Sequence, residues 1–112
     1  MPSHTITRPS ALESSLERLL FAKVRAIGGI AIKMAPLVKG TPDRLVLLPM
    51  GRMYLVELKT TKGTLDPAQR IWHERAANIG INVVTLKGAD AIVAWLRAVA
   101  DEQWYERDEE VS

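Results

Sequence analysis

The segment 53–59, Met-Tyr-Leu-Val-Glu-Leu-Lys, constrains the fold more than any other part of this chain. Its alternation predicts a β-strand, because successive side chains of a strand point to opposite faces of a sheet. One face is then apolar, whereas the other carries Glu57 and Lys59, about 6–7 Å apart by strand rise. Such a strand must pack on a hydrophobic core with one side and accommodate two charges on the other.

Apolar periodicity along the rest of the chain predicts further helices and strands. In the first strand, Ile30, Ile32 and Met34 alternate with smaller or charged residues, which predicts a half-buried strand. Gly28-Gly29 ends the helix before this strand, and residues 36–42 form a loop. The predicted helices cover residues 10–27, 66–79 and 90–99, and the predicted strands cover 30–35, 45–48, 53–59 and 81–86.

The resulting order, α-β-β-β-α-β-α, implies an α/β fold with helices packed on a mixed sheet. Three helix starts carry capping signals. Ser10 with Glu13, and Asp66 with Gln69, each match a capping box, and Asp90 precedes the last helix. The strands 45–48 and 53–59 are joined by a short turn with glycine, which predicts a β-hairpin with strand 53–59 in the middle of the sheet.

Asp43 stands at the start of the predicted hairpin, directly after Gly40-Thr41-Pro42. With the turn near residues 49–52, a residue near 43 lies across from one near 57–59, so Asp43 and Glu57 can converge. Two carboxylates beside Lys59 favour a Mg²⁺ or Mn²⁺ site, because hard cations prefer oxygen ligands. The alternatives are a turn-forming Asp43, an Asp43–Arg44 ion pair, and a simple Glu57–Lys59 pair on an exposed face.

Charge is distributed unevenly along the 112 residues, although the net charge is only +2. Six of the 13 acidic residues lie in the last twelve positions, so residues 1–100 hold 14 bases against 7 acids. A basic body suits a polyanionic partner such as DNA, although a solvated surface gives the same composition. We therefore expect an arm at 1–9, one domain at 10–100 and an acidic tail at 101–112.

The absence of cysteine excludes disulfides, thiolate metal sites and a cysteine nucleophile. The start, MPSHTITRPS, lacks the apolar run of a signal peptide, and no stretch reaches the roughly 18 apolar residues of a membrane span. These observations predict a cytoplasmic protein with no membrane partner.

The pattern Gly-x-Pro-Asp-Arg, followed by Val-Glu-Leu-Lys, resembles the VRR-NUC family of the PD-(D/E)XK nuclease superfamily. The resemblance covers roughly residues 10–88 and is closest to the small stand-alone, phage-type members. It implies a restriction-endonuclease-like αβββαβ core and a bacterial or phage-infected host cell, whereas the predicted C-terminal helix and the acidic tail lie outside the shared motifs. The matching positions are Gly40 to Arg44, Val56 to Lys59, Gly63 to Leu65, Gln69, and Trp72 to Glu74.

The same resemblance implies roles for the site residues. Asp43, Glu57 and the backbone carbonyl of Leu58 would bind the divalent metal. Lys59 would orient and help deprotonate the attacking water, or offset charge on the transition state. Gln69 would contact the site or the scissile phosphate, although it is equally a capping-box residue.

A glutamate of the first helix would complete the metal site, and two candidates are open. Glu13 already serves the predicted capping box with Ser10, whereas Glu17 lies at the edge of the apolar stripe. Family spacing to Gly28-Gly29 also favours Glu17.

Several bases flank the site and are candidate phosphate contacts, whereas His73 is interpreted as a surface or structurally satisfied residue rather than a catalyst. The candidate DNA-binding residues are Lys33, Lys39, Arg44, Lys62 and Arg70.

Together these features predict a Mg²⁺- or Mn²⁺-dependent DNA endonuclease. Resemblance to stand-alone family members favours a homodimer acting on branched DNA such as four-way (Holliday) junctions, since two-fold symmetry places two identical sites. The alternatives are a flap or single-strand nuclease, a non-catalytic DNA-binding module, and a protein-interaction domain that uses the acidic tail. The aromatic residues proposed for the dimer interface are Trp72, Trp95, Trp104 and Tyr105.

Overall fold

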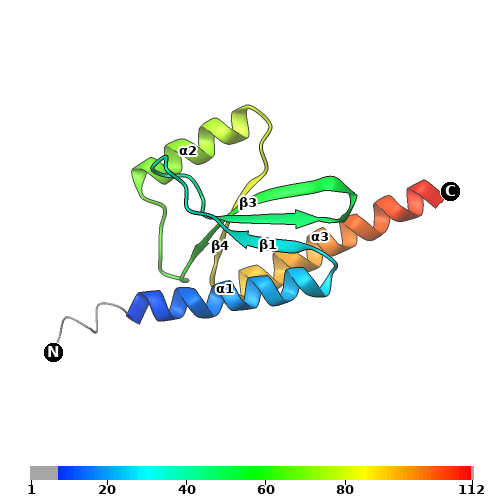
Figure 1. Cartoon of the computed structure of the whole chain (residues 1–112), viewed down its shortest axis with the longest axis horizontal. Coiled ribbons are helices and arrows are strands. Elements are labelled where there is room, and N and C mark those ends of the chain that lie inside the picture. Colours follow the sequence, from blue (N-terminus) through cyan, green and yellow to red (C-terminus); the bar gives the residue numbers. More distant parts are fainter. Residues whose placement is uncertain (1–7, 112) are drawn as a thin grey trace.

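The protein folds as a four-stranded sheet with helices on both faces, in a computed structural model that describes residues 8–111, and the side chains of 12–101. The observed element order confirms the predicted α-β-β-β-α-β-α sequence (Figure 1). The elements are α1 (Arg8–Ala26), β1 (Ile30–Lys33), β2 (Arg44–Leu48), the 3-10 helix η2 (Pro49–Gly51), β3 (Arg52–Lys59), α2 (Pro67–Asn78), β4 (Val83–Lys87) and α3 (Gly88–Val111).

The strands are arranged in the order β1-β2-β3-β4, so β3 lies inside the sheet as predicted. β1, β2 and β3 pair antiparallel, and β4 adds parallel to β3, which makes the sheet mixed. The parallel pair requires a crossover, and α2 supplies it. Within residues 8–111, no helix is long and apolar enough to cross a membrane.

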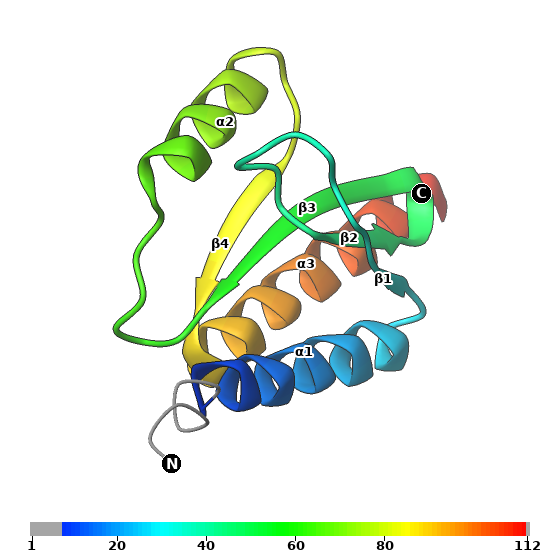
Figure 2. The same ribbon diagram turned by 60° about the vertical axis from the view of Figure 1, so that its left-hand side comes forward.

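Two helices, α1 and α3, cover one face of the sheet, and α2 lies on the other side (Figures 1 and 2). The core forms under α1 and α3, where Leu20, Val24 and Ile92 are fully buried. Val56 and Leu58 of β3 point into this core. Glu57 and Lys59 alternate with them and therefore face the side of α2.

The starts of the two long helices, and the end of α3, differ from the sequence prediction. α1 begins at Arg8, so Ser10 lies inside the helix and is not its N-cap. Pro9 accounts for the earlier start, since its fixed φ suits the first helical turn. α3 begins at Gly88, which puts Asp90 in the first turn, and continues to Val111 because no glycine or proline interrupts it. The backbone of residues 101–111 is therefore part of α3 rather than a separate tail.

The first strand has the opposite orientation from the one predicted. Ala31 packs against the core, whereas Ile30 and Ile32 are 60% and 40% exposed. Their ladder partners are Leu47 and Leu45, which share their face of the sheet. Alternation alone identifies the two faces of a strand, but it does not tell which face the helices cover.

The second helix begins as predicted. Asp66 caps it, Pro67 occupies its first turn, and the reciprocal hydrogen bonds of the capping box with Gln69 are both present. The loop before β2 packs against this start. Gly40 has φ +93°, and a Cβ placed there would lie 2.4 Å from the carbonyl oxygen of Ala68. The missing side chain thus lets the loop that leads to Asp43 touch α2.

We expect Gly40→Ala to destabilise the fold more than Gly51→Ala. Both glycines have positive φ, which alone costs about 1–2 kcal/mol for alanine, but a Cβ at Gly51 meets nothing within 4 Å. The difference between the two unfolding free energies in urea measures the contact between the loop and α2. Equal values for the two variants would show that this contact is unimportant.

Candidate active site

The hairpin register places Asp43 beside Glu57. In the β2–β3 ladder Arg44 is the partner of Val56, so the next position along the ladder sets Asp43 across from Glu57. The backbone of Asp43 is held by the residue that directly follows β1, since the carbonyl oxygen of Asp43 accepts a hydrogen bond from the Met34 amide at 2.7 Å. The sheet therefore fixes two carboxylate-bearing residues next to each other at the end of β3.

Glu57 is a buried acid in the middle of the sheet. The residue is 7% exposed, and its Oε2 accepts a hydrogen bond from Gln69 Nε2 at 3.1 Å. Burial raises the pKa of Glu57; Lys59 and Arg44 oppose this effect, whereas the negative charges of Asp43 and Asp66 add to it. The raised pKa means that, without a further cation, the folded protein disfavours a negative charge on Glu57 beside that of Asp43.

Gln69 performs two tasks at once, which the sequence presented as alternatives. Its Oε1 accepts the backbone amide of Asp66 at 3.0 Å and completes the capping box. Its Nε2 is thereby directed to Glu57. The capping box of α2 consequently orients the amide that holds the buried carboxylate.

Arg44 differs from the surface base that the sequence suggested. It is 8% exposed and lies among acids. Its Nε donates to Glu17 Oε1 at 3.0 Å, its Nη2 lies 2.8 Å from the same oxygen, and its Nη1 is paired with Asp43 at 2.5 Å. Of the predicted alternatives for Asp43, the local Asp–Arg ion pair is therefore present, and the direct phosphate contact proposed for Arg44 is not supported by this burial.

Through Arg44, the structure brings Glu17 to the site. Glu17 and Asp43 share one guanidinium, although they come from α1 and from the start of β2. Glu13 loses the reason given for its structural role, because the helix begins before Ser10. Lys33 also lies near Glu17, with Nζ 3.7 Å from Oε1, but its side chain is 59% exposed.

Whether the residues suit a divalent cation can be judged from unsatisfied atoms. Glu57 Oε1 is buried and has no hydrogen-bond partner, an arrangement that is costly for a carboxylate unless a cation or donor reaches it. No three acidic or histidine side chains within the described part of the chain are gathered closely enough to form a metal site on their own. These acids are not gathered as a metal site because the guanidinium of Arg44 holds both Glu17 and Asp43.

The remaining predicted residues surround this centre. Lys59 is half-buried on the same face as Glu57 and contributes to the field at that carboxylate. The Leu58 side chain is in the core, which leaves only its backbone to serve the site. Lys39, Lys62 and Arg70 are exposed.

His73 is a residue that sequence reasoning set aside. Its side chain is only 14% exposed, and its Nε2 is buried without a hydrogen-bond partner, 3.9 Å from Glu57 Oε1. Burial lowers the pKa of His73, and the nearby Lys59 lowers it further. The available signal was its spacing, because a residue four positions after Gln69 lies on the same side of a helix.

Comparisons with known proteins agree with this architecture. No profile of a protein family matches the chain. The protein "Putative nuclease p44" of Acyrthosiphon pisum secondary endosymbiont phage 1 is 42% identical over 79 residues, which are 70% of this chain and 85% of that protein. A solved structure described as a VRR_NUC domain superposes with a TM-score of 0.71 at 29% identity, covering 76% of this chain and 94% of that one. With the fold and the Asp43–Glu57–Lys59 arrangement on β2 and β3, these relatives show that the chain belongs to the VRR-NUC nuclease family.

Proposed function

We propose that this protein is a metal-dependent endonuclease that hydrolyses phosphodiester bonds of DNA. The observation that carries the proposal is the buried carboxylate of Glu57, which has one unsatisfied oxygen, faces the position of Asp43 and shares a sheet face with Lys59. A buried carboxylate oxygen without a hydrogen-bond partner is costly, and a bound cation would satisfy it. The named relatives, a phage nuclease and a VRR_NUC domain, support the same class of activity.

The residues that would hold Mg²⁺ or Mn²⁺ are Asp43, Glu57, the backbone carbonyl of Leu58 and Glu17. Their oxygen donors are the kind that hard cations prefer. When bound, such an ion lowers the pKa of a coordinated water and neutralises charge on phosphate oxygens. Burial, and after it the charge of Asp43, raise the pKa of Glu57, and a bound cation would oppose both effects.

The chain's own residues supply the remaining chemistry. Lys59 stands on the Glu57 face, where its charge can offset negative charge on the phosphate and orient the attacking water. Gln69 holds one oxygen of Glu57 and restricts its rotation. Arg44 keeps Glu17 and Asp43 together from inside the protein, so its role is to position these acids.

The exposed bases around the site suit contacts with the DNA backbone. Lys33, Lys39, Lys62 and Arg70 all reach solvent, as phosphate contacts require. Contacts with phosphates carry no sequence information, which fits an enzyme that selects DNA by its structure. We therefore propose branched DNA, and four-way junctions in particular, as the substrate.

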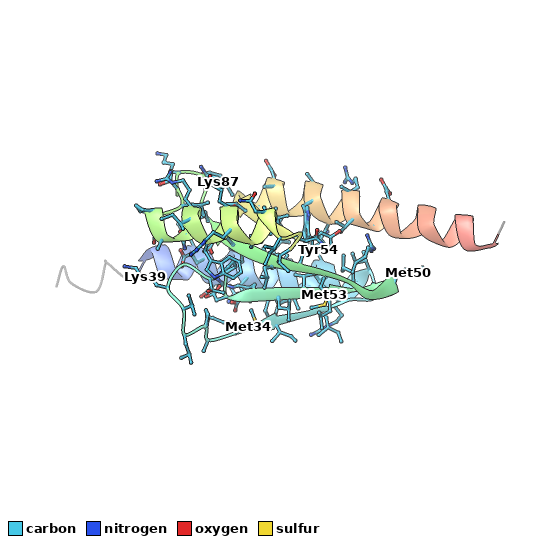
Figure 3. The ribbon with its side chains drawn as sticks, turned by 90° about the horizontal axis from the view of Figure 1, so that it is seen from above. Met34, Lys39, Met50, Met53, Tyr54 and Lys87 are labelled. Atoms are coloured by element: carbon cyan, nitrogen blue, oxygen red, sulfur yellow. The ribbon has the colours of Figure 1, made fainter. Side chains whose placement is uncertain are left out.

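We further propose that the enzyme is a homodimer that pairs through the sheet face left uncovered beyond α2. Figure 3 shows Met53 on the hairpin beyond the end of α2. This face is apolar, and several of its members are exposed. Its residues by ladder pairing are Ile30, Ile32, Leu45, Leu47, Met53 and Leu55.

A second copy fits this face for two reasons. The six residues carry no charge, so a two-fold arrangement that sets the face against itself creates no like-charge contact. The face also lies on the Glu57 side of the sheet but at the opposite end of β3, which leaves the site beside the interface rather than under it. A junction needs two matched cuts, and a two-fold dimer supplies two identical sites.

The interface expected from the sequence is changed by the structure. Trp95 packs edge-on against Tyr54, with ring centroids 5.1 Å apart, and belongs to the interior. Trp72 is half-buried beside Leu55 and Ile79. The side chains of Trp104 and Tyr105 lie outside those described.

Removal of any member of the proposed centre is expected to abolish metal-dependent cleavage. Asp43→Asn, Glu57→Gln and Lys59→Ala should each reduce the single-turnover rate by at least about 100-fold, as losses of transition-state stabilisation do. The assay uses linear, flapped and four-way-junction DNA with Mn²⁺, and with EDTA as the metal-free control. Wild-type rates for Glu57→Gln on every substrate would refute the site, and binding without cleavage by the parent would favour the non-catalytic module.

The Glu57→Gln variant should also be more stable than the metal-free parent at pH 8. Because burial raises the pKa of Glu57, its ionised form weakens the folded state, and glutamine removes that charge. The advantage should shrink as the pH falls and Glu57 takes up its proton. Urea unfolding at both pH values measures this, and it verifies that lost cleavage is not lost folding.

Glu17→Gln should slow cleavage much more than Glu13→Gln. Glu17 shares Arg44 with Asp43, whereas Glu13 has no described role at the site. Glu13→Gln keeps the size and helix propensity of the side chain, so its stability should change by under about 1 kcal/mol. Glu17→Gln also removes a charged partner of the buried Arg44 and should lower stability more, so urea unfolding verifies that this variant is folded. The opposite order of rates would assign the helix carboxylate to Glu13.

A glutamate on the uncovered face should separate the dimer. We expect the parent to scatter light as twice the 12.4 kDa chain mass, and Met53→Glu to behave as a monomer. Ala98→Glu, which adds the same charge to an exposed position of α3, is the matched control. Paired nicking of an immobile junction should be lost with the dimer. A parent that is monomeric and leaves junctions whole would overturn the dimer while leaving the nuclease intact.

A further inference from the structure

Two residues of α2 face the two oxygens of one carboxylate. Gln69 donates from Nε2 to Glu57 Oε2 at 3.1 Å, and His73 places its Nε2 3.9 Å from Glu57 Oε1. They are four positions apart, so they lie one above the other along one side of the helix. The capping box fixes the start of α2, and with it the place of both side chains over β3.

Gln69 forms a hydrogen bond with Glu57, whereas His73 lies close to Glu57 without forming one. Glu57 Oε1 and His73 Nε2 are both buried and both lack a hydrogen-bond partner. A buried polar group without a partner destabilises the folded state, because it has lost its water without gaining a hydrogen bond. At 3.9 Å the two atoms are too far apart for a hydrogen bond, but a shift of less than about 1 Å brings them within its range of roughly 2.7–3.2 Å. One small movement would satisfy both atoms.

The position of the proton on the imidazole determines whether the ring can close the gap. A neutral imidazole has a single N–H, and only the tautomer protonated at Nε2 can donate to a carboxylate placed at that atom. The Nδ1–H tautomer would bring a lone pair toward the carboxylate oxygen instead.

We propose that His73 is a positioning residue that donates from Nε2–H to Glu57 Oε1, so that Gln69 and His73 hold Glu57 at both oxygens. This rests on the proposed function, in which Glu57 binds the metal. Carboxylates that bind metals are themselves fixed by hydrogen bonds, and loss of such a partner typically lowers metal affinity or activity about 10–100-fold. With both oxygens held, the lone pairs left free for a cation have a defined direction.

The first experiment measures Mn²⁺ binding without DNA, by the loss of the free-ion signal in electron paramagnetic resonance. His73→Phe keeps an aromatic ring but removes the donor, and should weaken Mn²⁺ binding about tenfold. His73→Gln keeps an N–H donor of similar reach and should restore affinity close to that of the parent. Urea unfolding verifies that both variants are folded. Equal affinity for the parent and the phenylalanine variant, or equal loss in both variants, would overturn the proposal.

The second experiment reads the tautomer in the metal-free protein by ¹⁵N NMR of the imidazole. The chain has two histidines, so the His73→Gln spectrum identifies the His73 signals. We expect a neutral ring protonated at Nε2; an Nδ1–H tautomer would overturn the proposal. So would a ¹⁴N coupling from His73 to bound Mn²⁺ in pulsed spectra, since it would make His73 a ligand.

The two experiments separate this proposal from the proposed function. A parent that binds Mn²⁺ and cleaves DNA, with an unaffected phenylalanine variant, defeats the role of His73 alone. A parent that neither binds Mn²⁺ nor cleaves DNA defeats the proposed function. In that case the tautomer of the metal-free protein still decides whether Nε2 of His73 is the donor to Glu57.

Discussion

The carboxyl group of Glu57, placed inside a sheet, is the constraint on which the rest of the structure depends. A negative charge at this buried position must be balanced, and the neighbouring elements differ in their effect on it. β2 brings Asp43 opposite, which makes the imbalance worse, while Lys59 on the same strand and Arg44 reduce it. α2 supplies the hydrogen bond of Gln69 and the ring of His73. The remaining deficit is electrostatic, and a divalent cation has the charge to remove it.

Arg44 of β2 lies between a second pair of acids, Asp43 and Glu17. Asp43 and Glu17 would repel each other if they were left alone, and the buried guanidinium between them offsets part of their combined negative charge. A buried ion pair of this kind contributes little net stability, because the desolvation of the charges offsets their attraction. Its effect is on orientation, because two acids from different parts of the chain are held beside one guanidinium.

The sequence predicted those parts of the site that depend on local rules. Alternation along residues 53–59 placed Glu57 and Lys59 on one face, and the short turn fixed the hairpin register that sets Asp43 opposite Glu57. The capping box at Asp66 set the start of α2. Each of these follows from residues within about fifteen positions of one another, where periodicity and turn length decide the geometry.

The parts that failed depend on which face of an element the rest of the protein covers. Ile30 and Ile32 form an apolar strand side like any core-facing one, but α1 and α3 cover the opposite side. Arg44 and His73 have the composition of surface residues, and only their tertiary partners make them buried. The start of α1 was also predicted too late in the chain, because Ser10 and Glu13 match a capping box in a segment where Pro9 already permits a helix.

The exposed apolar side of β1 bears on how a small domain can act on DNA. A sheet in a monomer usually covers its apolar faces, yet here one end of the sheet remains open opposite α1 and α3, while α2 occupies the end that holds Glu57. α2 spans 12 residues between its capping box near the site and the segment that leads to β4, which pairs parallel to β3. The division of one face between a helix that builds the site and an apolar area that remains exposed is thus a result of the topology, and it leaves room for a second copy beside the catalytic centre.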